Sequence, residues 1–289
     1  MAAGAAGAPT DGVVAGRPRP WSVFPTAQAA PVIGVMTDID DTLTRDGAIE
    51  TAALDALARL AAAGVPVIAI TGRPLGWSVE RACTWPLAAV VAENGGVALI
   101  RDGGGWHTEY AQDEATRGAN ALRLRAAADR VLREVAGATL ARDSAGRVTD
   151  IAVDHAEFAQ LEAAAIARVV ALMRAEGLNA SVSSIHVNGW IGDHDKASAA
   201  HWMVRRLYGR ELAPEIGRWV YVGDSTNDQA LFAAFPASVG VANLRRFAAQ
   251  LQTWPAYITA GERGVGFAEV ARSVIAARSA ARPAARGAT

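Results

Sequence analysis

The chain has 289 residues, enough for one large domain or two ordinary ones, and its 51% hydrophobic content is ample for a packed core. A formal net charge of −1 excludes a broad basic surface for nucleic acid, and no apolar stretch reaches the roughly 18 residues of a membrane span. The single cysteine, Cys83, excludes an internal disulfide and fits a reducing compartment, so we expect a cytoplasmic protein without nucleic-acid or membrane partners.

Both ends of the chain have a biased composition. Residues 1–30 are rich in Ala, Gly and Pro with little periodicity, which predicts a disordered extension. A signal peptide is the alternative, but no Lys or Arg precedes Arg17, so its charged first region is missing. Residues 279–289, rich in Ala, Arg and Pro, predict a disordered tail.

The first predicted element is a buried strand, Val32–Met36, that ends in Thr37-Asp38-Ile39-Asp40-Asp41-Thr42. Ligands of open α/β sheets bind just beyond the carboxyl ends of such strands. If the segment is extended, Asp38, Asp40 and Thr42 share one side and Asp41 points away from the cleft. Carboxylates so close together indicate either a cation between them or a raised pKa, although a turn or helix cap also fits these residues.

Helices and strands then alternate, which predicts a doubly wound α/β core over residues 31–111. Thr71 and Gly72 lie between a strand end and the start of a helix at Pro74, where free N–H groups favour an anion, although an ordinary capping turn also fits. The predicted elements are a helix at Ile49–Ala63, strands at Val65–Ile70 and Leu87–Ala92, and a hairpin of Val97–Arg101 with Trp106–Tyr110.

The pattern changes over residues 112–188, where it predicts a small α+β domain inserted into the core. Its predicted helices are Asp113–Val135 and Ala156–Glu176, and its predicted strands are Ala138–Ala141, Val148–Val153, Ala180–Ser184 and Ile185–Trp190. The core resumes over residues 189–278, with helices at Ala197–Tyr208, Gln229–Phe235, around Leu244–Thr253 and at Val265–Ala277, and strands at Trp219–Val222, Ala237–Val241 and Ala256–Ile258.

Lys196 and the segment 223–228 complete the candidate site. Lys196 is the only lysine in the chain, and as a cation at a helix N-terminus it opposes the helix dipole at a cost of about 0.3–1 kcal/mol. A nearby anion, such as a carboxylate cluster or a phosphate, would offset this cost. Asp224 at a strand end and Asp228 one turn later can face one point, and oxygen ligands of this kind suit Mg²⁺.

Four segments thus lie at successive strand-to-helix junctions, and one cleft can collect them. The chemistry that they suit is phosphoryl transfer through an aspartyl-phosphate, in which a carboxylate attacks and lysine and metal spread the developing charge. The segments are Asp38/Asp40/Thr42, Thr71/Gly72, Lys196 and Asp224/Asn227/Asp228.

These motifs resemble those of the haloacid dehalogenase (HAD) superfamily, in particular its Cof-type phosphatases. Asp38-Ile39-Asp40-Asp41-Thr42 is similar to the first motif, Ile70-Thr71-Gly72-Arg73 to the second, Lys196 to the third and Gly223–Asp228 to the fourth. Glu93-Asn94-Gly95 and Tyr257-Ile258-Thr259…Gly264-Val265 also resemble this group. One departure is Asp41, where glycine is commoner. The resemblance implies a Rossmann-like core with an inserted cap over about residues 32–275.

The resemblance also implies roles for individual residues. Asp38 is expected to be the nucleophile and Asp40 the general acid and then base, while phosphate is held by Thr71, the Gly72 amide and Lys196, with Thr42 and Asn227 in support. Mg²⁺ is expected on Asp38, the Asp40 carbonyl and Asp224, with Asp228 or Asn227 completing or orienting the set. Contacts with the rest of the substrate are expected from Arg73, Asn94, Arg147, His186 and Asn188.

The resulting hypothesis is an Mg²⁺-dependent phosphatase of a small phosphorylated metabolite, most plausibly a sugar phosphate. A phosphomutase with the same motifs and a catalytically silent metabolite-binding module are the alternatives. The sequence leaves the substrate and the oligomeric state open.

Overall fold

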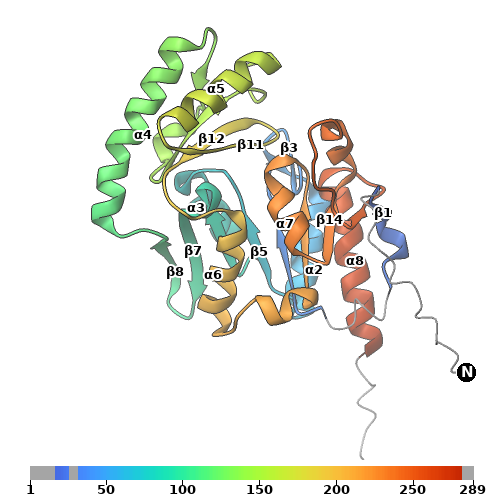
Figure 1. The fold of residues 1–289 in the computed structure, drawn as a ribbon. Coiled ribbons are helices and arrows are strands. Elements are labelled where there is room, and N and C mark those ends of the chain that lie inside the picture. Colours follow the sequence, from blue (N-terminus) through green and yellow to red (C-terminus); the bar gives the residue numbers. More distant parts are fainter. Residues whose placement is uncertain (1–16, 26–31, 282–289) are drawn as a thin grey trace, which may run out of the picture.

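A computed structural model describes residues 17–25 and 32–281, and its central feature is a large sheet (Figure 1). The order of its nine strands is β1-β15-β14-β13-β2-β5-β6-β7-β8, parallel from β1 to β6 and antiparallel from β6 to β8. The strands are β1 (Arg19–Pro20), β2 (Gly34–Thr37), β5 (Val67–Ile70), β6 (Ala89–Ala92), β7 (Val97–Asp102), β8 (Gly105–Tyr110), β13 (Trp219–Gly223), β14 (Ala237–Gly240) and β15 (Tyr257–Ile258). The predicted α/β fold class is confirmed.

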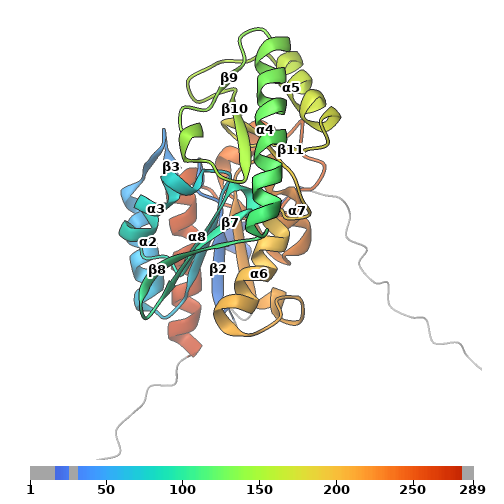
Figure 2. The same ribbon diagram turned by 90° about the vertical axis from the view of Figure 1, so that its left-hand side faces the viewer.

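Helices cover both faces of this sheet because its strands are apolar on both sides. Val35 and Val67 face a core shared with α2 (Thr51–Ala62), α3 (Leu75–Thr84) and α8 (Arg263–Ala281). Met36 and Ile68 face the opposite core, shared with α6 (Lys196–Tyr208) and α7 (Gln229–Ala234). Both layers of helices lie beside the sheet in Figure 2. None of the described helices has the length and apolar character that a membrane span requires.

Residues 113–190, here called the cap, form a second unit above the carboxyl ends of the core strands (Figures 1 and 2). Its antiparallel sheet has the order β11-β12-β10-β9, and α4 and α5 pack on it around Leu124, Val169 and Met173. The elements are α4 (Glu114–Glu134), β9 (Thr139–Leu140), β10 (Asp150–Asp154), α5 (Ala163–Ala175), β11 (Asn179–Val182) and β12 (His186–Trp190). Cap and core therefore each have their own sheet and apolar core.

Short elements connect these layers. A two-stranded ribbon follows the first motif, and 3₁₀ helices follow several strand ends. They are the strands β3 (Thr44–Arg45) and β4 (Ala48–Ile49), and the 3₁₀ helices η1 (Trp21–Val23), η2 (Glu93–Gly95), η3 (Ser144–Gly146), η4 (Ala213–Arg218), η5 (Thr226–Asp228) and η6 (Ala242–Phe247).

Several predicted elements differ from the structure. The helix predicted to start at Ala156 starts at Ala163, because the Asp154 carboxylate accepts hydrogen bonds from the amides of residues 156–159 and holds them in a loop. The helix predicted around Leu244–Thr253 is the short η6 followed by turns. The last helix, α8, ends at Ala281 and not at the predicted Ala277. Residues 282–289 lie outside the described part of the chain.

The prediction of disorder for residues 1–30 is wrong for residues 17–25. β1 pairs with β15, and the buried Trp21 stacks on Phe24 and donates a hydrogen bond from Nε1 to Ser273 Oγ at 3.1 Å. Aromatic burial of this size compensates for a composition that is otherwise typical of disorder. The rest of the predicted extension falls outside the described residues.

Candidate active site

The candidate residues come together where the central strands end. β2 lies between β13 and β5, so the loops after these three parallel strands meet at one edge of the sheet. Asp38 follows β2, Thr71 follows β5, and Asp224 follows β13. The first loop is a turn closed by amide hydrogen bonds from residues 42–44 to the Ile39 carbonyl, so the predicted extended segment is wrong beyond Thr37.

Lys196 lies at the centre of a buried ionic cluster. Its Nζ donates to Asp38 Oδ1 at 2.7 Å and to Asp228 Oδ1 at 2.8 Å. Asp228 also accepts hydrogen bonds from the Tyr221 hydroxyl at 2.6 Å and from the amides of Asp224 and Ser225. The predicted anionic partner for the cation at the start of α6 is thus a pair of carboxylates.

The buried cluster holds more acid than Lys196 can neutralise. Burial raises the pKa of Asp38 to about 7, because desolvation and the carboxylates of Asp228 and Asp40 outweigh the lysine. Burial and the neighbouring carboxylates of Asp38, Asp228 and Asp41 raise the pKa of Asp224 well above its ordinary value. An additional cation would therefore be favourable here.

Asp224 meets the requirement for a metal ligand. Its Oδ1 is buried without a hydrogen-bond partner among the described residues, and ligand atoms of Asp38, Asp224 and Asp228 all lie within 4.8 Å of one another. Carboxylate oxygens in such a group suit Mg²⁺. Both oxygens of Asp228 already accept hydrogen bonds, so Asp38 and Asp224 are better placed than Asp228 to bind a metal.

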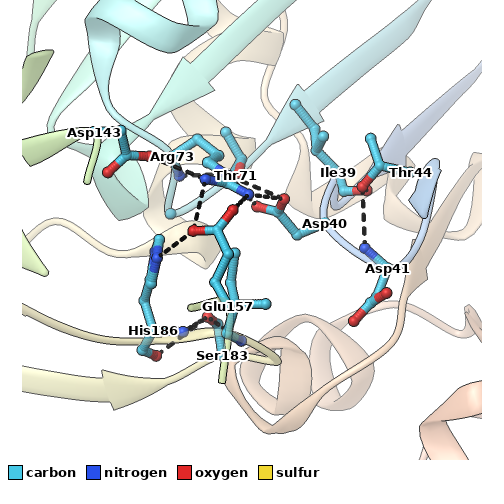
Figure 3. A network of polar contacts seen from close by, with 12 residues as sticks. Ile39, Asp40, Asp41, Thr44, Thr71, Arg73, Asp143, Glu157, Ser183 and His186 are labelled. Carbon is cyan, nitrogen blue, oxygen red and sulfur yellow. Dashed lines mark hydrogen bonds and ion pairs between the residues drawn. The ribbon is translucent and has the colours of Figure 1, made fainter. Parts of the chain in front are cut away.

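Asp40 belongs to a second network, shown in Figure 3. Arg73 Nε lies 2.9 Å from both carboxylate oxygens of Asp40, and the other nitrogens of Arg73 reach two acids of the cap. Its Nη2 donates to Glu157 at 2.7 Å, and its Nη1 donates to Asp143 at 3.1 Å. Glu157 in turn lies 2.9 Å from Nε2 of the buried His186. Arg73 thus ties the candidate acid/base to the cap.

The remaining predicted substrate residues contact one another across the cap boundary. Arg147 Nη1 and Asn188 Nδ2 donate to the Gly72 carbonyl at 3.0 and 3.2 Å. Both also donate to Asp150, as Asn94 does at 3.5 Å. A Cβ on Gly72 would lie 3.1 Å from Asn188 Oδ1, so glycine permits this close approach. The structure therefore places these side chains above the second motif.

Three other predicted residues have local contacts. Thr71 Oγ1 accepts a hydrogen bond from the Arg73 amide at 3.1 Å. Asn227 Oδ1 accepts one from Ser225 Oγ at 2.8 Å. Thr42 Oγ1 is buried without a hydrogen-bond partner in the described part of the chain.

Glu93 has a role that the sequence reasoning missed. Its fully buried carboxylate accepts hydrogen bonds from the amides of Leu75, Val148 and Thr149 and from the Thr149 hydroxyl. It therefore fastens the start of β10 to the core. The motif Glu93-Asn94-Gly95 pointed to this position but not to its cap partners.

Asp41 also differs from its prediction. It lines a cavity of about 300 Å³ together with Asp40 and Arg73 from the core and Glu157 from the cap, so it does not point away from the cleft. The reason is its backbone φ of 54°, which turns its side chain toward Arg246 and Arg263. Sequence reasoning missed both arginines, since they lie more than 200 residues from Asp41 with no local motif to mark them.

The contacts of Glu157 predict a pH-dependent contribution to stability. Burial opposes ionisation, but hydrogen bonds from His186 and Arg73 lower its pKa from 4.5 to about 2. We expect Glu157→Gln to lower the free energy of unfolding by about 2–3 kcal/mol at pH 7. Because the pKa of Glu157 is lower in the folded state than in the unfolded state, its carboxylate stabilises the fold at pH values above the unfolded pKa. This stabilisation is lost as the pH falls toward 2, so the difference in unfolding free energy between wild type and Glu157→Gln should roughly halve by pH 3.

Urea unfolding of both proteins at pH 7 and pH 3 measures this difference. The control is Glu80→Gln, because the Glu80 side chain is 76% exposed and its ion pair should contribute under about 1 kcal/mol at either pH. If Glu157→Gln lowers the free energy of unfolding equally at both pH values, the ionised carboxylate of Glu157 is not the cause of the stabilisation.

Comparisons with known proteins agree with this geometry. Residues 35–117 match the model of the haloacid dehalogenase-like hydrolase family. Among solved structures, the chain is similar to protein 0175 of Thermoplasma acidophilum, with 16% identity and a TM-score of 0.64 over 84% of this chain and 98% of the other. It is also similar to the sucrose-phosphatase of Synechocystis, solved with sucrose and phosphate (16%, 0.60, 84% and 97%), and to a HAD/COF-like hydrolase of Plasmodium vivax (15%, 0.62, 87% and 99%). No curated protein sequence matches the chain.

Proposed function

We propose that this chain is a member of the haloacid dehalogenase superfamily and an Mg²⁺-dependent phosphatase acting through an aspartyl-phosphate, because residues 35–117 match the haloacid dehalogenase-like hydrolase model and the fold is similar to that of a HAD/COF-like hydrolase. The observation that carries this proposal is the buried cluster in which Lys196 bridges Asp38 and Asp228 while Asp224 keeps a free oxygen. A purely structural ion pair would not require an excess of buried carboxylates.

The proposed chemistry assigns one task to each group. Asp38 attacks the phosphorus, and Asp40 protonates the leaving oxygen and then activates water. Lys196, the Thr71 hydroxyl and the Gly72 amide hold the phosphoryl oxygens as charge develops on them. Arg73 acts as a positioning residue, because it holds the Asp40 carboxylate by both oxygens.

The metal site would use Asp38, Asp224 and the Asp40 carbonyl. A bound Mg²⁺ would supply positive charge to the phosphoryl group and neutralise the clustered carboxylates. The orphaned oxygen of Asp224 and the raised pKa of this residue support this assignment.

Mg²⁺ is expected to stabilise the protein as well as to activate it. Ligand at 100 times its Kd adds about 2.7 kcal/mol to the free energy of unfolding. We expect thermal unfolding of the wild type to shift upward with Mg²⁺ and downward with EDTA, and the Mg²⁺ shift to vanish in Asp224→Asn. A wild-type melting temperature that does not respond to Mg²⁺ would contradict the metal site.

The substrate class that we propose is a small phosphorylated metabolite, in particular a sugar phosphate. The cavity of about 300 Å³ beside Asp40 suits a small polar molecule, and charged side chains line it. One similar structure is a sucrose-phosphatase solved with sucrose and phosphate, and another is described as related to a trehalose-6-phosphate phosphatase.

The direct experiment measures phosphate release from a panel of phosphorylated metabolites, with Mg²⁺ and with EDTA. Metal-dependent release supports the phosphatase. Isomerised sugar phosphate without free phosphate would favour the phosphomutase. Tight metabolite binding without turnover would favour the binding module and would contradict the proposed function.

A further inference from the structure

The cavity beside Asp40 has two walls of different electrostatic character. Glu157 and Phe158 of the cap form one wall, and Asp41, Arg246 and Arg263 of the core form the other. Asp40 lies in the same cavity. In the proposed reaction, the group attached to the ester oxygen that Asp40 protonates would therefore border this cavity.

Charges on the cap wall are already matched. Arg73 is shared by Asp40, Asp143 and Glu157, and Glu157 has His186 as a second partner. The Arg73 side chain is only 5% exposed. The charges of Arg73 and Glu157 are therefore matched before a ligand binds.

On the core wall, one carboxylate has two arginine partners. Arg263 Nε donates to Asp41 Oδ1 at 2.7 Å, and Arg246 Nη2 donates to Asp41 Oδ2 at 2.6 Å. Two guanidinium groups thus share one carboxylate in this wall.

Other acids compensate this charge only weakly. Glu262 approaches Arg263 to 3.8 Å, but its side chain is 56% exposed. Asp46 lies at an exposed position on the cavity lining, where solvent and salt screen it. Arg246 also reaches Asp224 Oδ2 at 3.4 Å, and that carboxylate belongs to the proposed metal site.

Arg263 is held in place before any ligand binds. Its amide donates to Asn243 Oδ1 at 2.9 Å, its φ is 49°, and its side chain is 15% exposed. The contact with Asp41 uses Nε, and Nη1 lies 3.8 Å from the exposed Glu262, so Asp41 does not occupy the two terminal nitrogens of the guanidinium. A fixed guanidinium loses little entropy on binding an anion, which favours recognition by this residue.

We propose that Arg246 and Arg263 bind an acidic group on the leaving group, so that the preferred substrate is a phosphate ester carrying a second anion, either a carboxylate or another phosphate. The inference rests on the proposed phosphatase function and makes its substrate class more specific. Asp41, where related motifs have glycine, holds the two cations in the cavity wall.

Paired substrates test this selectivity. Each pair contains a neutral and an acidic leaving group: glucose 6-phosphate with 6-phosphogluconate, glycerol 3-phosphate with 3-phosphoglycerate, and fructose 6-phosphate with fructose 1,6-bisphosphate. The readout is the ratio of kcat/KM for the acidic member to that for the neutral member. This ratio cancels any general loss of folded enzyme, and the third pair separates phosphate from carboxylate recognition.

We expect the wild type to prefer the acidic member, and Arg263→Gln to reduce the ratio by about 10- to 100-fold, the usual effect of losing a charge-assisted hydrogen bond. Arg263→Lys should restore part of it, since the charge remains. Arg205→Gln is the matched control, because Arg205 forms an exposed two-point ion pair with Glu211 on the surface of α6; its ratio should equal that of the wild type.

Each failure identifies which hypothesis is wrong. Hydrolysis by the wild type with no preference for the acidic members, or an unchanged ratio in Arg263→Gln, overturns the anion subsite and leaves the phosphatase intact. No hydrolysis of any ester overturns the proposed function, and the subsite with it.

Discussion

Asp38→Asn should reduce kcat for phosphate esters by about 10⁴-fold or more, with the fold intact. The amide oxygen that replaces the carboxylate is neutral and a poor nucleophile, and loss of a covalent nucleophile is among the most damaging changes to an enzyme. Stability should not suffer. Burial raises the pKa of Asp38 to about 7, so the ionised side chain is unfavourable in its cluster, and a neutral amide removes that cost.

Phosphate release and thermal unfolding of the same samples check this prediction. Asp55→Asn is the matched control, because Asp55 is exposed on α2, and its activity should equal that of the wild type. An Asp38→Asn enzyme that retains a tenth of the wild-type kcat would show that Asp38 is not the nucleophile. A variant with lost activity and an unchanged or higher melting temperature separates chemistry from unfolding.

Lys196→Met should damage both stability and activity. The methionine has a similar length but no charge, so Asp38 and Asp228 lose the cation that lies 2.7 and 2.8 Å from them. Removing one partner of a buried ionic group costs about 3–5 kcal/mol, because the remaining charges are left uncompensated. Phosphate binding should weaken as well, since the point charge proposed to hold it is gone.

A double variant distinguishes this cause from lost packing. Lys196→Met combined with Asp228→Asn removes charge from both sides, so it should be more stable than the sum of the single effects predicts. Urea unfolding in EDTA provides the free energies. Because the chain has no second lysine, the control is Arg205→Met, which removes an exposed ion pair with Glu211. It should lower the free energy of unfolding by less than about 1 kcal/mol. If the change in unfolding free energy of the double variant equals the sum of the two single effects, the electrostatic explanation is wrong.

The sequence predicted which residues meet where the central strands end, because these residues follow the strands directly. Asp38, Thr71 and Asp224 each come immediately after a short apolar run, and parallel strands bring such positions to one edge of a sheet. Lys196 stood out because it is the only lysine in the chain and because it lies at a helix start, where a cation is unfavourable. Local patterns were sufficient here, since strand, turn and helix signals depend on neighbouring residues.

Predictions failed where distant segments decide the local structure. Residues 17–25 resemble a disordered segment in composition, yet Trp21 is buried against Tyr257, and no local signal reveals a partner 236 positions away. The start of α5 moved to Ala163 because the Asp154 carboxylate captures the amides that follow it, although the apolar spacing of the segment suits a helix.

By itself, then, the sequence determined the α/β alternation, the inserted cap segment and the four motifs whose acids, threonine and lysine indicate phosphoryl transfer. Only the tertiary structure decided that Arg73 joins Asp40 to Glu157 of the cap, 84 residues beyond Arg73, and that Arg246 and Arg263 share Asp41 across 205 and 222 residues. The physical reason is that side-chain periodicity describes only which face of an element a residue occupies. Which charges finally meet depends on how the cap, the loops and the last helix pack on the sheet, and this packing is set by the whole chain.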